Sequence, residues 1–111
     1  MVIIKIIIFK INLIMYRQKA YYKDGYIFRA PSKRINKKYD VFDEYDNYIT
    51  SFGARKMTGE PYEQFEDLVS DFYSDYNHYD PKRRKAYRAR HKNDNLEDKT
   101  SAGYFAMKYL W

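Results

Sequence analysis

One basic segment of the chain has a spacing that suits contact with phosphate groups. A helix over the run PKRRKAYRARHK would place four cationic or titratable side chains on one face, at i, i+4, i+7 and i+8: Arg84, Arg88, His91 and Lys92. Such a face can bind a nucleic-acid backbone by releasing counterions, without reading the base sequence. The alternative is a solvated face, or one neutralised within the fold by the acidic segment that precedes it.

A second basic cluster follows Pro31 and Ser32, which favour a loop. It holds four cationic side chains within six positions: Lys33, Arg34, Lys37 and Lys38. We expect this loop, together with Arg84, Arg88 and Lys92, to bind an anionic partner. The expected partner is nucleic acid, because neighbouring tyrosines could stack on bases, or else an acidic protein surface.

A few side chains could support acid–base or metal chemistry. His78 and His91 beside Asp80 could transfer protons, and Asp75, His78 and Asp80 could hold a hard metal ion. Structural roles account for the same residues, since Asp80 suits a helix cap and His91 a helix C-terminus. No glycine-rich phosphate loop, GxSxG or HExxH motif is present. We therefore expect no catalytic residue, no metal and no cofactor.

The composition limits the class of protein further. The 111 residues contain 21 Lys and Arg, 15 Asp and Glu, and no Cys, which excludes disulfides and thiolate zinc sites and favours one domain. The net charge of +6 is the sum of +9 in residues 1–38, −9 in residues 39–80 and +6 in residues 81–111. Because these segments can neutralise one another on folding, the high net charge is weak evidence for nucleic-acid binding.

The N-terminal segment MVIIKIIIFKINLIM contains twelve apolar residues. It is shorter than the roughly 20 apolar residues that a spanning helix needs, and it lacks a signal-peptide cleavage pattern. Its β-branched residues favour a strand. We treat residues 1–19 as an apolar extension or strand, either buried in the fold or disordered, and residues 20–111 as a single domain with no membrane span.

Turn residues and apolar spacing predict the elements that position the basic clusters. Asp24-Gly25 predicts a hairpin within 21–29, and a second hairpin is expected within 39–54. Apolar residues at helical spacing predict a helix over 60–77, carrying Tyr62, Phe65, Leu68, Val69, Phe72, Tyr73 and Tyr76. Helices are also expected over 81–92, capped by Asp80, and over 102–110, capped by Thr100 or Ser101. The predicted fold class is α+β: a small antiparallel sheet of hairpins packed against two or three C-terminal helices.

Three blocks of sequence carry a resemblance to a known family. They are Lys37-Lys38-Tyr39 with Val41, Phe52-Gly53-Ala54, and SDYNHYDPKRRKAYRARH followed by SAGYFAMKYLW. Over about residues 37–111 the chain resembles the DUF5754-like proteins of large double-stranded DNA viruses of algae and amoebae. The matching positions of the third block are Asp75, Tyr76, Asp80, Arg83, Tyr87, Arg90, His91, Gly103 and Trp111. The segment 55–73 departs from the family pattern and is expected to be an insertion.

The resemblance implies a viral origin, with the protein in the virion or in the viral factory of the infected-cell cytoplasm. It implies no activity. It also suggests that Arg83, Arg90 and His91 are buried structural partners of Asp75 and Asp80, which would leave Arg84, Arg88 and Lys92 free to bind.

These observations lead to one expected function and two alternatives. We expect a non-enzymatic interaction protein of a large DNA virus that binds an anionic partner through its basic patches. The first alternative is a minor virion or capsid-associated structural protein that contacts other virion proteins, because the N-terminus is apolar and the charges are segregated. The second is a small His-dependent hydrolase or nuclease.

Overall fold

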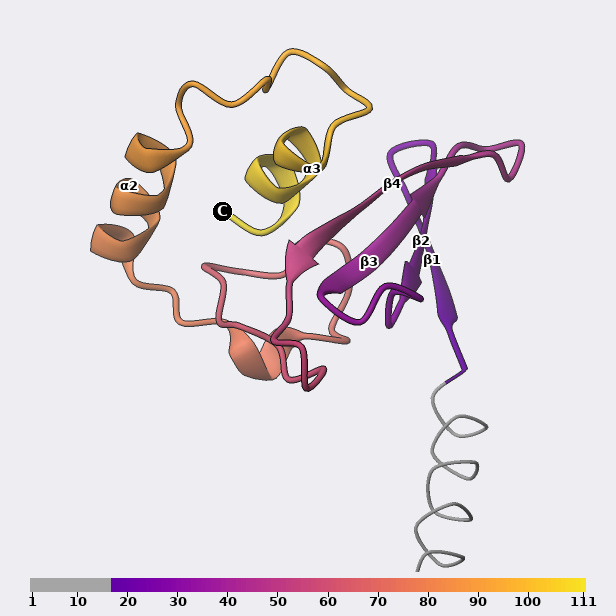
Figure 1. The fold of residues 1–111 in the computed structure, drawn as a ribbon, viewed down its shortest axis with the longest axis horizontal. Helices are drawn as coiled ribbons and strands as arrows, with labels where there is room; N and C mark the ends of the chain where they lie inside the picture. The colour runs from indigo at the N-terminus through magenta and orange to yellow at the C-terminus, as the bar shows by residue number, and fades with distance from the viewer. Residues whose placement is uncertain (1–16) are drawn as a thin grey trace, which may run out of the picture.

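Residues 17–111, which the computed structural model describes, form a four-stranded antiparallel sheet followed by helices (Figure 1). The strands pair in sequence order as a meander: β1 Lys19–Lys23, β2 Tyr26–Ala30, β3 Lys37–Phe42 and β4 Tyr48–Ala54. The predicted α+β class, with hairpins before C-terminal helices, is confirmed. The predicted N-terminal extension lies almost entirely outside the described residues.

Both predicted hairpins are present, and local turn chemistry explains them. Asp24 and Gly25 have φ angles of 54° and 81°, and two successive positive φ values are what a tight hairpin turn requires. In the β3–β4 turn, the Asp43 carboxylate accepts the N–H groups of Tyr45 and Asn47, each at 2.9 Å. Each turn sets the register of the two strands that it joins, so that Tyr21 lies opposite Phe28 and Tyr39 opposite Phe52.

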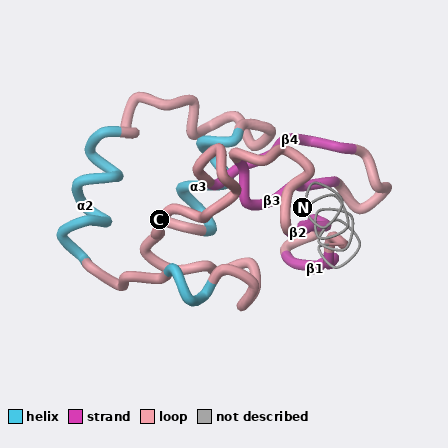
Figure 2. The backbone as a smooth tube through the Cα atoms, turned by 60° about the horizontal axis from the view of Figure 1, so that its bottom comes forward, coloured by secondary structure: helices cyan, strands magenta, loops and turns pink. Residues whose placement is uncertain are grey.

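Aromatic rings fill the core between the sheet and helix α3, Ala102–Tyr109. Phe28 and Phe52 from the strands meet Phe105 and Tyr109 from the helix, with ring centroids 5.0–6.4 Å apart. Such pairs contribute about 0.5–1.5 kcal/mol each beyond the burial of their area. The predicted helix start is confirmed, since the Ser101 hydroxyl accepts the Tyr104 N–H at 3.1 Å. Figure 2 shows α3 lying between the strands and helix α2, which spans Pro81–Arg90.

The prediction of a helix over residues 60–77 is wrong. This segment is irregular apart from a short 3-10 turn, η1, at Ser74–Tyr76. Its backbone N–H groups do not form the regular bonds of a helix. Those of Phe65 and Glu66 bond to the Leu110 carbonyl at 3.1 and 3.2 Å, and that of Gln64 bonds to the Tyr76 carbonyl at 3.0 Å. Side chains of this segment also accept its backbone N–H groups, as Asp67 accepts that of Val69 and Ser70 that of Phe72. Such bonds compete with the backbone bonds of a helix.

Helix α2, Pro81–Arg90, begins as predicted, although it ends before residue 92. The Asp80 carboxylate caps it by accepting the Lys82 N–H at 2.9 Å, and the proline at the first position has no N–H to satisfy. None of its residues is fully buried. The helix is therefore attached to the rest of the protein through its longer side chains, and one side of it forms the wall of a cleft.

Candidate anion-binding cleft

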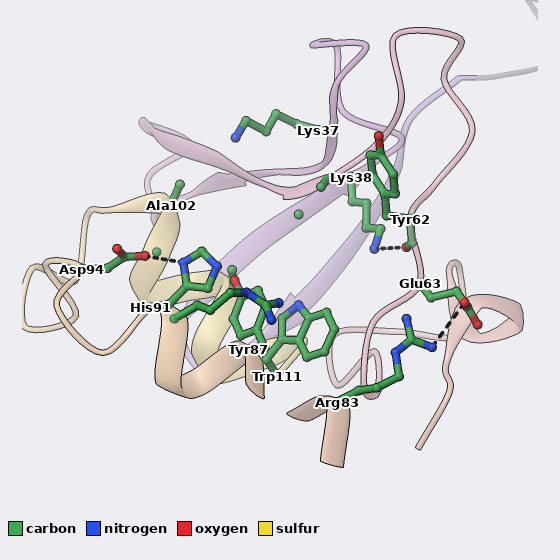
Figure 3. A pocket seen from close by; sticks show the side chains of 15 residues that line it. Lys37, Lys38, Tyr62, Glu63, Arg83, Tyr87, His91, Asp94, Ala102 and Trp111 are labelled. Atoms are coloured by element: carbon green, nitrogen blue, oxygen red, sulfur yellow. Dashed lines mark hydrogen bonds and ion pairs between the residues drawn. The ribbon is translucent and has the colours of Figure 1, made fainter. Parts of the chain in front are cut away.

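A cleft of about 500 Å³ lies where the ends of β3 and β4, the segment after β4, α2 and the start of α3 meet (Figure 3). Small residues of β4 and α3 leave the space open, and charged and aromatic side chains of β3, α2 and the loops surround it. Its lining consists of Lys37, Lys38, Gly53, Ala54, Tyr62, Glu63, Arg83, Tyr87, Arg90, His91, Asp94, Ala102, Gly103, Ala106 and Trp111.

The charged groups of the lining differ in whether they are already paired. Arg83 lies 3.3 Å from the Glu63 carboxylate, and His91 Nδ1 lies 2.8 Å from Asp94 Oδ2. Two further cations of the lining are accessible to solvent, Lys37 on β3 and Arg90 on α2. Among the described residues, no ion pair or hydrogen bond engages their side chains. The cleft therefore keeps uncompensated positive charge on two walls that come from different parts of the chain.

Lys38 forms part of the floor and is not an exposed cation of a loop, so the prediction that it binds a partner is wrong. It lies in β3 and is 2% exposed. Its ammonium donates to the Tyr62 carbonyl at 2.6 Å and to Gln64 Oε1. Burial lowers the pKa of Lys38 to about 8, and the negative charge of Asp67 opposes that shift. The side chain therefore stabilises the segment after β4 from within.

Gly53 in β4 makes room for that buried lysine. Its φ angle is +79°, and a Cβ at this position would lie 2.8 Å from the Lys38 Cβ and 3.0 Å from Leu110 Cδ1. Any side chain here would be strained by the backbone angle and would collide with the floor of the cleft. The FGA block of the sequence is thus explained by packing beneath the cleft.

Stacked rings form the helix side of the cleft. The Tyr87 ring lies between Trp111 and His91, 4.1 Å from each centroid, at interplanar angles of 5° and 27°. Arg84 and Arg88 hold Trp111 in place: their nitrogens lie 2.6 and 2.9 Å from its main-chain oxygen. These two arginines are therefore hydrogen-bonded within the fold and are not free as predicted, while their binding of a partner stays a prediction.

The predicted network of Arg83, Arg90 and His91 with Asp75 and Asp80 does not form. Asp80 is occupied as the cap of α2, and Asp75 is exposed at η1. The three basic side chains instead line the cleft. The sequence pattern predicts Arg84 and Arg88 as free and Arg83 and Arg90 as buried. It cannot reveal that Arg84 and Arg88 bond to the Trp111 main-chain oxygen, because that oxygen does not depend on the type of side chain.

The remaining predicted basic residues, Lys33, Arg34 and Lys92, are exposed. Arg55 holds the loop that carries Lys33 and Arg34. Its guanidinium donates to the carbonyls of Ser32 and Arg34, both at 3.0 Å. None of these three cations is part of the cleft lining.

The two histidines are not brought together. His78 is outside the cleft lining: its Nδ1 accepts the Asp80 N–H at 2.9 Å, and its ring packs 5.2 Å from Trp111. Burial, with Arg83 nearby, lowers the pKa of His78. Among residues 17–111, no group of three His, Asp or Glu side chains is placed to share a metal ion, so Asp75, His78 and Asp80 do not form such a set.

Sequence reasoning missed Tyr62, Glu63 and Asp94 as cleft residues. The sequence pattern predicts Tyr62 on the apolar face of a helix that does not form. The resemblance gave the better signal, because six of its nine matching positions in the third block line the cleft: Arg83, Tyr87, Arg90, His91, Gly103 and Trp111.

Comparison with family models, with curated protein sequences and with solved structures found no match for the chain. In the described part of the chain, no helix combines the length and the apolar character needed to cross a bilayer. The function is therefore inferred from the cleft itself.

Proposed function

We propose that this protein is a non-enzymatic interaction protein that binds nucleic acid at the cleft, with Lys37 and Arg90 as the contacts to phosphate. The observation that carries the proposal is the pair of uncompensated cations in the lining, Lys37 from the sheet and Arg90 from α2. Lys33, Arg34 and Lys92 are exposed cations outside the lining. Phosphate neutralisation supplies most of such affinity.

The proposal predicts salt-dependent binding that charge reversal at the cleft removes. We expect a fluorescent single strand of about ten nucleotides to bind with an affinity that falls steeply with salt. Lys37→Glu and Arg90→Glu should each weaken binding by roughly ten-fold or more, because each removes a phosphate contact and adds repulsion. Fluorescence anisotropy over a range of salt concentrations measures this.

Lys85→Glu is the matched control, because Lys85 is an exposed cation of α2 that does not line the cleft. It makes the same change in net charge and should alter binding only slightly. Equal losses in all three variants would mean that net charge, and not the cleft, holds the strand. Absent or salt-insensitive binding would remove the proposal.

We also propose, from the resemblance, that the protein acts in infection by a large DNA virus, in the virion or the viral factory. Six of the nine matching positions of its third block line the cleft. Nucleic-acid binding suits both locations.

A further inference from the structure

The cleft has charge for one phosphate group rather than for a run of them. Glu63 and Asp94 are part of the lining and are already paired with cations of the cleft. Their carboxylates would repel the phosphates that flank a bound one. Only Lys37 and Arg90 remain uncompensated within the described lining. Two positive charges balance one terminal phosphate, which carries about −2 at neutral pH, or at most two phosphodiester groups.

Tyr62 is the aromatic ring of the lining that is open to a ligand. The rings of Tyr87 and Trp111 are stacked on each other, whereas Tyr62 is 50% exposed and pairs with no other ring among residues 17–111. The Lys56 ammonium lies 5.7 Å from the centroid of the Tyr62 ring, so a base would stack on the opposite face. Its backbone is fixed, because its N–H donates to the Ala54 carbonyl at 3.1 Å and its carbonyl accepts the Lys38 ammonium. In Figure 3, Tyr62 and Lys37 lie on the sheet side of the cleft and the stacked rings of Tyr87 and Trp111 lie on the helix side, and the Tyr62 ring extends from its backbone away from that stack.

The volume of the cleft fits a small unit. About 500 Å³ falls within the range of sites that enclose small ligands. The bases of a duplex are stacked inside it and cannot reach a ring at the edge of a cleft, whereas an unpaired base can leave its neighbours and stack on tyrosine.

We infer that the cleft binds a single unpaired nucleoside phosphate, with its phosphate between Lys37 and Arg90 and its base against Tyr62. This inference rests on the proposed function and names the unit of nucleic acid that the site accepts. The same chemistry is offered by a free nucleotide and by an unpaired residue of a strand.

The test compares ligands that share parts of this unit. Trp111 is the single tryptophan of the chain and lines the cleft, so its fluorescence reports occupancy directly. We expect AMP to change this fluorescence and to displace a labelled single strand. Adenosine and inorganic phosphate should each bind at least ten-fold more weakly, because each supplies only half of the contacts. A duplex of the same length should compete poorly.

Substitutions at Tyr62 test the stacking. Tyr62→Ala should weaken both AMP and strand binding by roughly ten-fold, while Tyr62→Phe, which keeps the ring, should bind as the wild type does. Tyr45→Ala is the matched control, because Tyr45 is 78% exposed and lies outside the cleft. Circular dichroism checks that each variant is folded.

The outcomes separate this inference from the proposed function. AMP binding as tight as strand binding points to a free nucleotide, and tighter strand binding points to a strand, and either supports the inference. If Tyr62→Ala binds like Tyr45→Ala and AMP does not compete, while Lys37→Glu and Arg90→Glu still weaken strand binding, the inference fails and the proposed function stands. If neither AMP nor the strand binds, both fail.

Discussion

At the scale of single residues, Lys38 carries a charge into the interior without a carboxylate partner within ion-pair distance. Two neutral oxygens, the Tyr62 carbonyl and Gln64 Oε1, accept its protons. Burial favours the neutral amine and lowers the pKa of Lys38 to about 8 from its ordinary value of 10.5. The folded protein therefore releases this proton more readily than the unfolded chain does.

This difference predicts a stability that rises with pH. Stability increases with pH wherever the unfolded state binds more protons, which for Lys38 is the window between about 8 and 10.5. The gain in stability is complete above pH 10.5 and is lost as the pH falls through about 8. Between about pH 7.5 and about pH 9.5 we expect the free energy of unfolding to gain about 2 kcal/mol from Lys38.

Denaturant unfolding of the wild type and of Lys38→Met across that range measures the gain. The free energy of unfolding of the wild type should rise by about 2 kcal/mol relative to that of Lys38→Met, because methionine has no proton to lose. A Lys37→Met variant controls for the loss of a lysine, since Lys37 forms no buried contact of this kind. Parallel pH profiles for the wild type and Lys38→Met would contradict a lowered pKa.

At the scale of elements, the segment 64–77 takes its shape from residues that follow it by more than thirty positions. The Leu110 carbonyl accepts the N–H groups of Phe65 and Glu66, and the Tyr109 carbonyl accepts that of Leu68. Within the segment, the buried Asp67 carboxylate accepts the N–H groups of Val69, Ser70 and Tyr73. Burial raises the pKa of Asp67 even though these bonds lower it.

Two leucines test how this segment is held. Leu110 is 1% exposed and Leu68 is 45% exposed. Leu110→Ala should lower the free energy of unfolding by about 2–5 kcal/mol, because it leaves a cavity beneath Gly53. Leu68→Ala, the same chemical change, should cost about 0.5 kcal/mol or less. Equal costs in thermal or denaturant unfolding would show that this part of the core does not depend on the C-terminal segment.

Local chemistry decided which elements could be predicted from the sequence. The turn at Asp24-Gly25 and the caps at Asp80 and Ser101 act within a few residues, so the hairpins, α2 and α3 follow from sequence patterns. The apolar spacing of 60–77 also suits a helix, yet the actual partners of its backbone lie at Leu110, which no local pattern contains.

The same distinction applies to the candidate site. The sequence identified the basic character of α2 but not which arginines face the cleft, because Trp111 determines how the helix is oriented by bonding Arg84 and Arg88. It identified Lys37 and Lys38 as a basic pair, but β3 directs one to the cleft and buries the other. Alternation along a strand explains this only once the strand is known.

At the scale of the whole molecule, the acidic segment 39–80 supplies structural carboxylates as well as surface charge. Asp40 and Asp67 are buried and serve as acceptors for hydroxyl and N–H groups. Hydrogen bonds to the Lys33 N–H and to serine hydroxyls hold the pKa of Asp40 below its ordinary value, although burial raises it. Part of the negative charge is therefore used within the fold, whereas Glu63 of the same segment pairs with Arg83 in the cleft.

The proposed viral setting is tested on whole particles. We expect peptides of this protein in purified virions or in viral factories of infected cells, and mass spectrometry of both fractions detects them. Peptides from residues 1–16 would also report whether the apolar N-terminus is retained. Absence from both fractions would contradict the proposed location while leaving the chemistry of the cleft untouched.

The dependence of the 64–77 segment on Leu110 has a consequence for the time at which the protein acquires its cleft. The meander joins only neighbouring strands, so its contacts are local and can form early. Tyr62 and its neighbours reach their places only when the C-terminal segment is available to bond them. During synthesis, where N-terminal parts order first, the sheet can therefore be complete while the cleft is still unformed, and a nascent chain lacks the proposed binding site until Leu110 has emerged.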